Sequence, residues 1–138
     1  MSVSDIARSM LDASPADLQM DRGVLVDCIE ACVECAQACS QCADDCLSES
    51  AVSELTHCIG LDLTCADICA VTARTLSRRV GFQVDIARAQ LEACAMACRA
   101  CGEECAAHGD HGMAHCAQCA ERCRACERAC RDLLGAMA

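Results

Sequence analysis

The chain of 138 residues contains no tryptophan, no tyrosine and one phenylalanine, and all of its 11 basic residues are arginine. Without tryptophan and tyrosine it lacks the rings that usually stack on nucleobases, and a net charge of −10 opposes binding to a phosphate backbone. We therefore expect no nucleic-acid partner. Proline is also scarce, because Pro15 is the single one. The sequence after it can therefore form long, uninterrupted helices.

Long apolar runs are missing as well. No segment approaches the length and apolarity of a membrane span, so we expect no membrane partner. Near the amino terminus, Asp5, Arg8 and Asp12 interrupt every short apolar run, and no basic stretch precedes an apolar one as in a signal peptide. The sequence therefore predicts a cytoplasmic protein, in which thiols remain reduced.

Cysteine is abundant, with 18 residues. The first six follow one another at intervals of four, three, four, three and four residues, a spacing that keeps side chains on one face of a helix. Three later segments repeat this pattern, one of them in thinned form. The four sets are Cys28, Cys32, Cys35, Cys39, Cys42 and Cys46; Cys58, Cys65 and Cys69; Cys94, Cys98, Cys101 and Cys105; and Cys116, Cys119, Cys123, Cys126 and Cys130.

The residues between the cysteines are mainly alanine, glutamate, glutamine, aspartate and arginine, which favour helix. Ser48 to Ser50, Gly81 and the segment from His108 to Gly112 interrupt the pattern. We expect helices at about 24–47, 51–79, 83–107 and 112–135. Ser50 or Ser53 can cap the second of these helices, and Asp110 the fourth.

The first 22 residues are expected to form a helical extension. Ser14 to Asp17 match a capping box with Pro15 at the first helical position, which predicts a helix that begins at Ser14 and can run through Gly23. Residues 3–12 can form another short amphipathic helix.

These elements predict an all-α fold in one domain, 1–138. Four helices of similar length with short links are most simply an antiparallel up-down-up-down four-helix bundle, here over residues 24–135 with the short N-terminal helical extension before it. The cysteine stripes then face one another across the core. The first stripe alone spans a rise of roughly 27 Å, so a tube of thiols follows.

Such a tube favours Cu(I). Helix residues three or four apart hold their Cβ atoms about 5–6 Å apart, which lets two thiols of one helix converge on one ion. Soft thiolates select Cu(I), zinc and iron–sulfur clusters, and Cu(I) is the member of that set that accepts only two or three sulfurs. With bridging thiolates the load is on the order of one Cu(I) per cysteine, many per monomer. This count predicts a non-enzymatic store.

Other interpretations of the cysteines remain. An isolated cysteine is usually a small buried hydrophobe. A zinc or mixed-metal thiolate buffer is the second hypothesis, although structural zinc sites usually draw ligands from turns. The cysteine motif of bacterial ferredoxins, which binds iron–sulfur clusters, ends in Cys-Pro, and this dipeptide is absent here. Disulfides are also disfavoured, because helices with six, three, four and five cysteines offer no unique pairing. A thiol redox protein would need one accessible cysteine of low pKa, and none stands out.

Antiparallel threading predicts two unlike ends. The four histidines fall at one end, which we name the histidine end, and imidazole and thioether are softer landing sites for Cu(I) than water. Asp62 stands where the second stripe expects a cysteine, and His108 continues the third stripe. We interpret this end as the copper port, with His57, Asp62, His108, His111, Met113 and His115 as candidate ligands besides the 18 cysteines.

For each histidine singly, a solvated loop residue is the alternative, and Asp62 can instead be a polar core residue that fixes register. The opposite, closed end is predicted to be a dry plug. Its residues are Leu25, Thr72, Leu76, Val80, Phe82, Ile86, Leu91, Leu133 and Leu134.

A second apolar line accompanies the thiols on two helices. Two stripes on one helix exceed what one core can bury, so we expect a homo-oligomer. The lines are Ile59, Leu63, Ala66 and Ala70 on the second long helix and Ile29, Val33 and Ala36 on the first.

Together, the repeated C-x-x-x-C and C-x-x-C pairs on four helices, the terminal histidines and the lack of a signal peptide resemble the cytosolic branch of the copper storage proteins, over about residues 15–135. The resemblance implies Cu(I) ligation by all 18 cysteines and assembly as a tetramer of bundles. A transient copper donor or acceptor protein is a further expected partner. The thinned second stripe, with Asp62, departs from the pattern.

Overall fold

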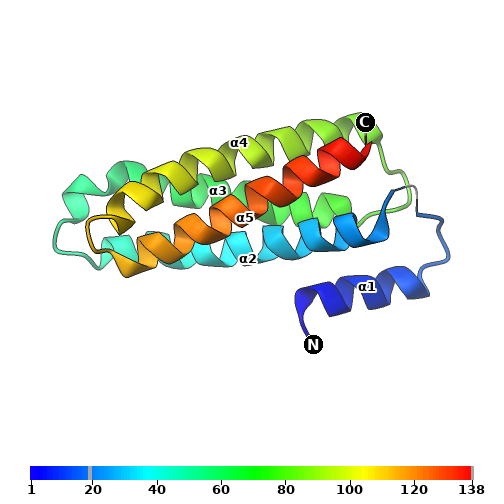
Figure 1. Ribbon diagram of the computed structural model, residues 1–138, viewed down its shortest axis with the longest axis horizontal. Helices are drawn as coiled ribbons and strands as arrows, with labels where there is room; N and C mark the ends of the chain where they lie inside the picture. Colours follow the sequence, from blue (N-terminus) through cyan, green and yellow to red (C-terminus); the bar gives the residue numbers. More distant parts are fainter. Residues whose placement is uncertain (19, 138) are drawn as a thin grey trace.

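The computed structural model describes residues 1–18 and 20–137. The helices are α1 (Val3–Ala13), α2 (Arg22–Leu47), α3 (Thr56–Leu76), α4 (Val84–Gly109) and α5 (Ala114–Met137), with a short 3₁₀-helix, η1 (Val52–Glu54), before α3. Helices α2 to α5 form the predicted antiparallel bundle (Figure 1). In it α2 and α4 each pack against both α3 and α5. The all-α fold class is confirmed.

The predicted short helix over 3–12 is present as α1. Its first turn is closed by a capping box, in which the Asp5 amide donates to Ser2 Oγ at 3.1 Å and the Ser2 amide donates to Asp5 Oδ2 at 3.0 Å. The amide of Ser4 donates to Glu30 Oε2 at 2.9 Å, and this contact ties α1 to α2. None of the residues of α1 is buried, and the helix lies along the outside of the bundle beside α2 (Figure 1).

The helix predicted to begin at Ser14 is wrong. Residues 14–18, 20 and 21 are not helical, and Gln19 lies outside the described residues. Because Pro15 favours an extended residue before it, Ser14 ends α1 with ψ 134°, and its Oγ accepts from the Ala16 amide at 3.2 Å. Helix α2 begins instead at Arg22, where Asp21 caps it by accepting from the Val24 amide at 2.9 Å.

Two predicted caps are also wrong. Helix α3 begins at Thr56, later than expected, and neither Ser50 nor Ser53 caps it, because η1 intervenes and the buried Leu55 precedes the first turn. Asp110 ends α4 by donating its amide to the carbonyl of Ala106 at 3.0 Å.

Two of the three turns between the bundle helices depend on glycine. Gly81 in the α3–α4 turn and Gly112 in the α4–α5 turn have φ values of 71° and 94°, which favour glycine. Gly109 lies so close to α5 that a Cβ there would be 2.9 Å from Cα of Ala117. Helices α4 and α5 can therefore approach each other closely at the histidine end.

The closed end is an apolar plug, although a smaller one than predicted. Leu25, Leu76, Leu91 and Leu133 are fully buried. Thr72 is also fully buried, where it donates to the Ile68 carbonyl at 2.7 Å and accepts from Gln90 Nε2 at 2.9 Å. Val80, Phe82 and Ile86 lie outside the plug because they belong to the α3–α4 turn and the first turn of α4, whereas Leu134 packs against the core from α5. Of these residues, Val80 and Ile86 are exposed, and Phe82 and Leu134 are half-buried.

The second apolar lines are only partly external. Ile29 is buried and Ile59 is half-buried against the core, so these two belong to the bundle interior and not to an outer line. Val33 and Leu63 are exposed as expected, at 37% and 52%. Among the described helices, none combines the length and apolarity that a membrane crossing requires.

Candidate metal centre

The interior of the bundle is lined by sulfur. All 18 cysteines are buried, with exposed fractions of 1% or less, and all of them are free thiols. Their heptad spacing turns each stripe inward, as the sequence predicted. Neighbouring Sγ atoms lie between 3.6 Å, for Cys69 and Cys98, and 4.0 Å, for Cys35 and Cys65.

The thiols of different helices meet at successive levels of the tube. At one level, each of the four bundle helices supplies one sulfur, and the four Sγ atoms lie within 4.8 Å of one another: Cys35, Cys69, Cys98 and Cys126. Three further groups overlap with this one or with each other: Cys126 and Cys35 are each shared with the first group, and Cys39 and Cys123 are shared between two of the others. These groups are Cys32, Cys94, Cys126 and Cys130; Cys35, Cys39, Cys65 and Cys123; and Cys39, Cys101, Cys119 and Cys123. Shared members allow one thiolate to bridge ions at two levels.

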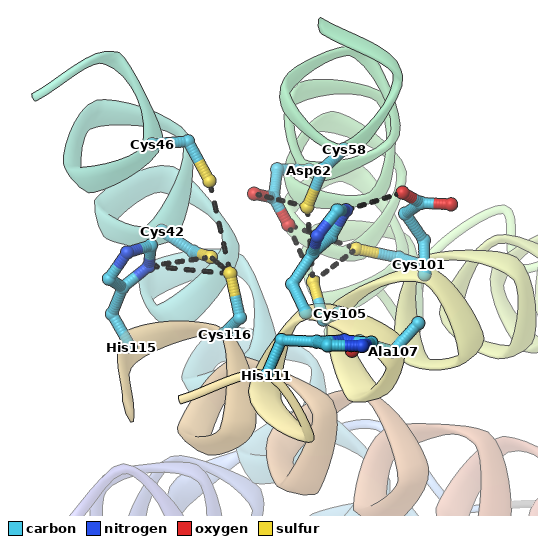
Figure 2. Close-up of polar contacts among 12 residues, drawn as sticks. Cys42, Cys46, Cys58, Asp62, Cys101, Cys105, Ala107, His111, His115 and Cys116 are labelled. Carbon is cyan, nitrogen blue, oxygen red and sulfur yellow. Dashed lines mark hydrogen bonds and ion pairs between the residues drawn. The ribbon is translucent and has the colours of Figure 1, made fainter. Parts of the chain in front are cut away.

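Asp62 lies inside this sulfur network and is fully buried. Its carboxylate accepts hydrogen bonds from thiols on three helices, and Figure 2 shows those of Cys58, Cys101 and Cys105. The Sγ distances are 3.1 Å for Cys101, 3.4 Å for Cys105, 3.5 Å for Cys119 and 3.9 Å for Cys58. Burial raises the pKa of Asp62 to about 7, and the Cys101 hydrogen bond opposes that rise.

A separate ligand group lies on the α2–α5 side of the histidine end. Nδ1 of His115 is 3.4 Å from Sγ of Cys42 and 3.5 Å from Sγ of Cys116 (Figure 2). Cys46 completes a set in which all four ligand atoms lie within 4.8 Å of one another. Nε2 of His115 is buried and forms no hydrogen bond with the described residues. This group we name the His115 set.

The other candidate ligands lie at the same end but outside these sets. Nε2 of His108 donates to Glu104 Oε2 at 2.7 Å, so its imidazole is held by its own helix. Nδ1 of His111 donates to the Ala107 carbonyl at 2.8 Å, and this side chain is exposed. His57 is exposed, and Met113 is half-buried against the core.

The helical phase therefore indicated His108 as the histidine that faces the core, whereas in the structure His115 is the histidine beside the thiols. His115 immediately precedes Cys116, a spacing that places consecutive residues on different sides of a helix. It reaches Cys42 because it lies in the first turn of α5, where α5 packs beside the end of α2. No periodicity in the sequence marks that contact.

Two thiols of the His115 set, Cys46 and Cys116, are protonated at neutral pH. Burial raises the pKa of Cys116 to about 11, and burial likewise raises the pKa of Cys46. A soft cation that binds here must therefore displace thiol protons.

Comparison with known proteins agrees with this geometry. The family profile described as copper storage protein matches residues 22–135, which comprise α2, α3, α4 and all but the last two residues of α5. The chain belongs to the copper storage protein family. The matched residues include all 18 cysteines, Asp62 and the four histidines, whereas α1 lies before them.

Solved structures of family members superpose closely. A copper storage protein from Streptomyces lividans loaded with 10 copper equivalents is 50% identical, with a TM-score of 0.92 over 94% of this chain and 98% of that one. Another structure, of a protein described as a cytosolic copper storage protein from Streptomyces lividans, is 46% identical, with a TM-score of 0.80 over 95% and 97% of the two chains. Cu(I)-bound BsCsp3 is 40% identical, with a TM-score of 0.67 over 78% and 94%.

One curated relative is an uncharacterized cysteine-rich protein of Bacillus subtilis, YhjQ, which is 42% identical over 67 residues. The alignment spans 49% of this chain and 62% of YhjQ.

Proposed function

We propose that this protein stores and sequesters many Cu(I) ions in the cytoplasm, bound by thiolates inside the bundle. The observation that carries the proposal is the continuous network of 18 buried, unbridged thiols along the tube. Membership of the copper storage family and copper-loaded relatives support it. A cytosolic relative supports the compartment.

Charge balance favours Cu(I) over zinc. With about one Cu(I) per thiolate, the ionic charges of a filled core cancel. A zinc ion bound by four thiolates instead retains a net charge of −2, and burying uncompensated charge is costly. Among the described residues, the buried polar or charged side chains are Asp62 and Thr72, and neither is a cation that could offset this charge.

The burial of the thiols also supports a store over an enzyme or a thiol redox protein. A redox cysteine must be accessible to its substrate, and here every thiol is exposed by 1% or less. Each sulfur has sulfur neighbours of similar kind, so no cysteine is set apart as a nucleophile.

Metal capacity tests the proposal. Reduced apoprotein is titrated with Cu(I) against a competing chelator, and bound metal per chain is measured after desalting. We expect more than about ten Cu(I) per chain, from the approximate one-to-one ratio with thiolates. Saturation at about one to four ions, or retention of zinc in preference to Cu(I), would contradict the proposal.

The histidine end is the proposed copper port. Two groups of soft ligands lie there side by side: the His115 set, and the thiols of Cys58, Cys101 and Cys105 around Asp62 (Figure 2). The closed end offers no comparable path, because Leu25, Leu76, Leu91 and Leu133 fill it. We assign His115 and Asp62 as ligands in the core, and His57, His108, His111 and Met113 as transient contacts for incoming copper.

We also propose a homo-oligomer, with a tetramer as the expected form. A groove of about 420 Å³ runs along the α2–α3 seam and is lined by Val33, Ala36, Ala66, Ala70 and Ala73 among others. Leu63 on α3 and Val71 near this seam are exposed, at 52% and 41%. Covering these apolar side chains by another bundle would remove them from water. A transient copper donor or acceptor would then meet the histidine end.

A further inference from the structure

A cavity of about 530 Å³ lies between α1 and the closed end of the bundle, away from every cysteine. Its walls are mostly aliphatic and include Ile6 and Met10 of α1 and Ile29 of α2. Ser77 and Arg79, at the end of α3 and in the turn after it, form one polar edge. This volume lies within the usual range for small-molecule sites, about 300–1,000 Å³.

Arg79 at that edge carries a charge that the described residues do not neutralise. Its guanidinium stacks over the Phe82 ring at 5.3 Å and donates to the Leu76 carbonyl. Its Nε is buried and has no hydrogen-bond partner, and among the described residues no carboxylate pairs with it. Burial lowers the pKa of Arg79, which shows the cost of removing this cation from water. An anion at the cavity edge would offset that cost.

We propose that this cavity binds a single-chain aliphatic carboxylate, with its head group at Arg79 and its chain along Ile6, Met10 and Ile29. One cation fits a monoanion better than a phosphate of higher charge. The lining residues include no aromatic side chain for a base or ring to stack on, so the rest of the ligand is an alkyl chain.

The site is separate from copper storage. No cysteine, histidine or acidic residue lines the cavity. Its outer wall is α1, which precedes the residues 22–135 that the copper storage family shares. A ligand there would add apolar contacts to a helix that now has no buried residue, so binding stabilises α1 against the bundle.

Calorimetric titration of the full-length reduced apoprotein tests the proposal. The probe is decanoate, kept below its micelle concentration, and decanol is the uncharged control with the same chain. We expect one decanoate per chain and clearly weaker binding of decanol. R79Q should weaken decanoate binding about tenfold, the effect of one lost charged hydrogen bond. R78Q removes the neighbouring, exposed arginine, which is absent from the cavity lining, and should leave binding unchanged.

Three results would overturn the proposal: no decanoate binding, equal binding of decanoate and decanol, or equal loss in R78Q and R79Q. Far-ultraviolet circular dichroism and Cu(I) capacity of R79Q should match the parent, which separates a binding defect from misfolding and from any failure of copper storage. Light scattering identifies the competing occupant. If decanoate does not bind and I6S with M10S reduces the oligomer mass, a second copy of the chain covers this face instead.

Discussion

Sγ of Cys101 lies 3.1 Å from Oδ1 of Asp62, and thiols from α3, α4 and α5 surround the same carboxylate. A carboxylate buried among thiols has lost its water, and its pKa rises to about 7 as a result. Near neutral pH, Asp62 is therefore either a neutral acid or an anion, whereas the cysteine that the spacing predicts there would offer only a sulfur ligand.

The first prediction concerns apoprotein stability. Between the unfolded pKa of 3.8 and the folded value of about 7, folded Asp62 keeps a proton that the unfolded chain has released. The Asp62 contribution to the free energy of unfolding therefore falls as pH rises through this window, and the loss is complete above about 7. D62N has no proton to lose. We expect it to exceed the parent in stability at pH 8 by on the order of 1–3 kcal/mol, and the two to converge near pH 4.

Urea unfolding of reduced, metal-free protein at several pH values measures this difference. D67N, at an exposed position on the same helix, is the matched control and should follow the parent. A D62N curve parallel to that of the parent would show that Asp62 does not titrate in this window.

The second prediction concerns the copper port. H115A removes the imidazole that lies 3.4 Å from Cys42, so one of the two ligand groups at the histidine end loses its nitrogen. We expect Cu(I) loading and removal rates to change about fivefold, equivalent to about 1 kcal/mol for one contact. Capacity should stay within about two ions of the parent, because sulfur supplies nearly all of the ligands.

Stopped-flow absorbance of the thiolate-to-copper band measures the rates. Q118A removes an exposed polar side chain about one turn after His115 on α5 and should load like the parent. The triple variant H108A, H111A and D62N tests the rest of the port, and parental rates in both H115A and this variant would place the path of copper elsewhere.

The third prediction is that the fold precedes the metal. Buried cysteines pack as small hydrophobes, and Leu25, Leu76, Leu91 and Leu133 close one end without any ligand. The reduced apoprotein should give a strongly helical far-ultraviolet circular dichroism spectrum that changes little on Cu(I) loading. A disordered apo chain that folds only on metal addition would contradict this, since it would place the folding free energy in the metal sites.

The fourth prediction concerns the apolar seam between α2 and α3. An aspartate at Leu63 or Val33 would bury a charge if another bundle covers this face, so L63D and V33D should lower the oligomer mass. M96D changes an exposed apolar residue on α4, away from the seam, and serves as the control. Light scattering at micromolar concentration decides, and a monomeric parent protein would remove the basis for the interface.

The sequence by itself determined the bundle and its chemistry. Intervals of three and four residues are the period of the helix, so Cys28 to Cys46 share a face wherever that helix packs. The position of a side chain around its own helix depends only on the local sequence, so four thiol-lined helices with short links predict a sulfur-lined core. Soft thiolates in that core predict Cu(I) as the bound ion. Every cysteine predicted to face the core is buried there.

Tertiary structure alone decided which groups at the ends of the helices meet. His108 has the helical phase of the third cysteine stripe, yet its Nε2 bonds to Glu104 Oε2, one turn earlier on the same helix, at 2.7 Å. His115 lies outside the phase of the fourth stripe, but its Nδ1 lies 3.4 Å from Sγ of Cys42 on the neighbouring helix α2. Helical period describes side chains in the middle of a helix, but a terminal residue depends on how the turn, here with Gly109 and Gly112, sets one helix against the next. The position of α1 was undetermined for the same reason. Its attachment rests on contacts such as Ser4 with Glu30, between residues 26 positions apart, and no local pattern encodes them.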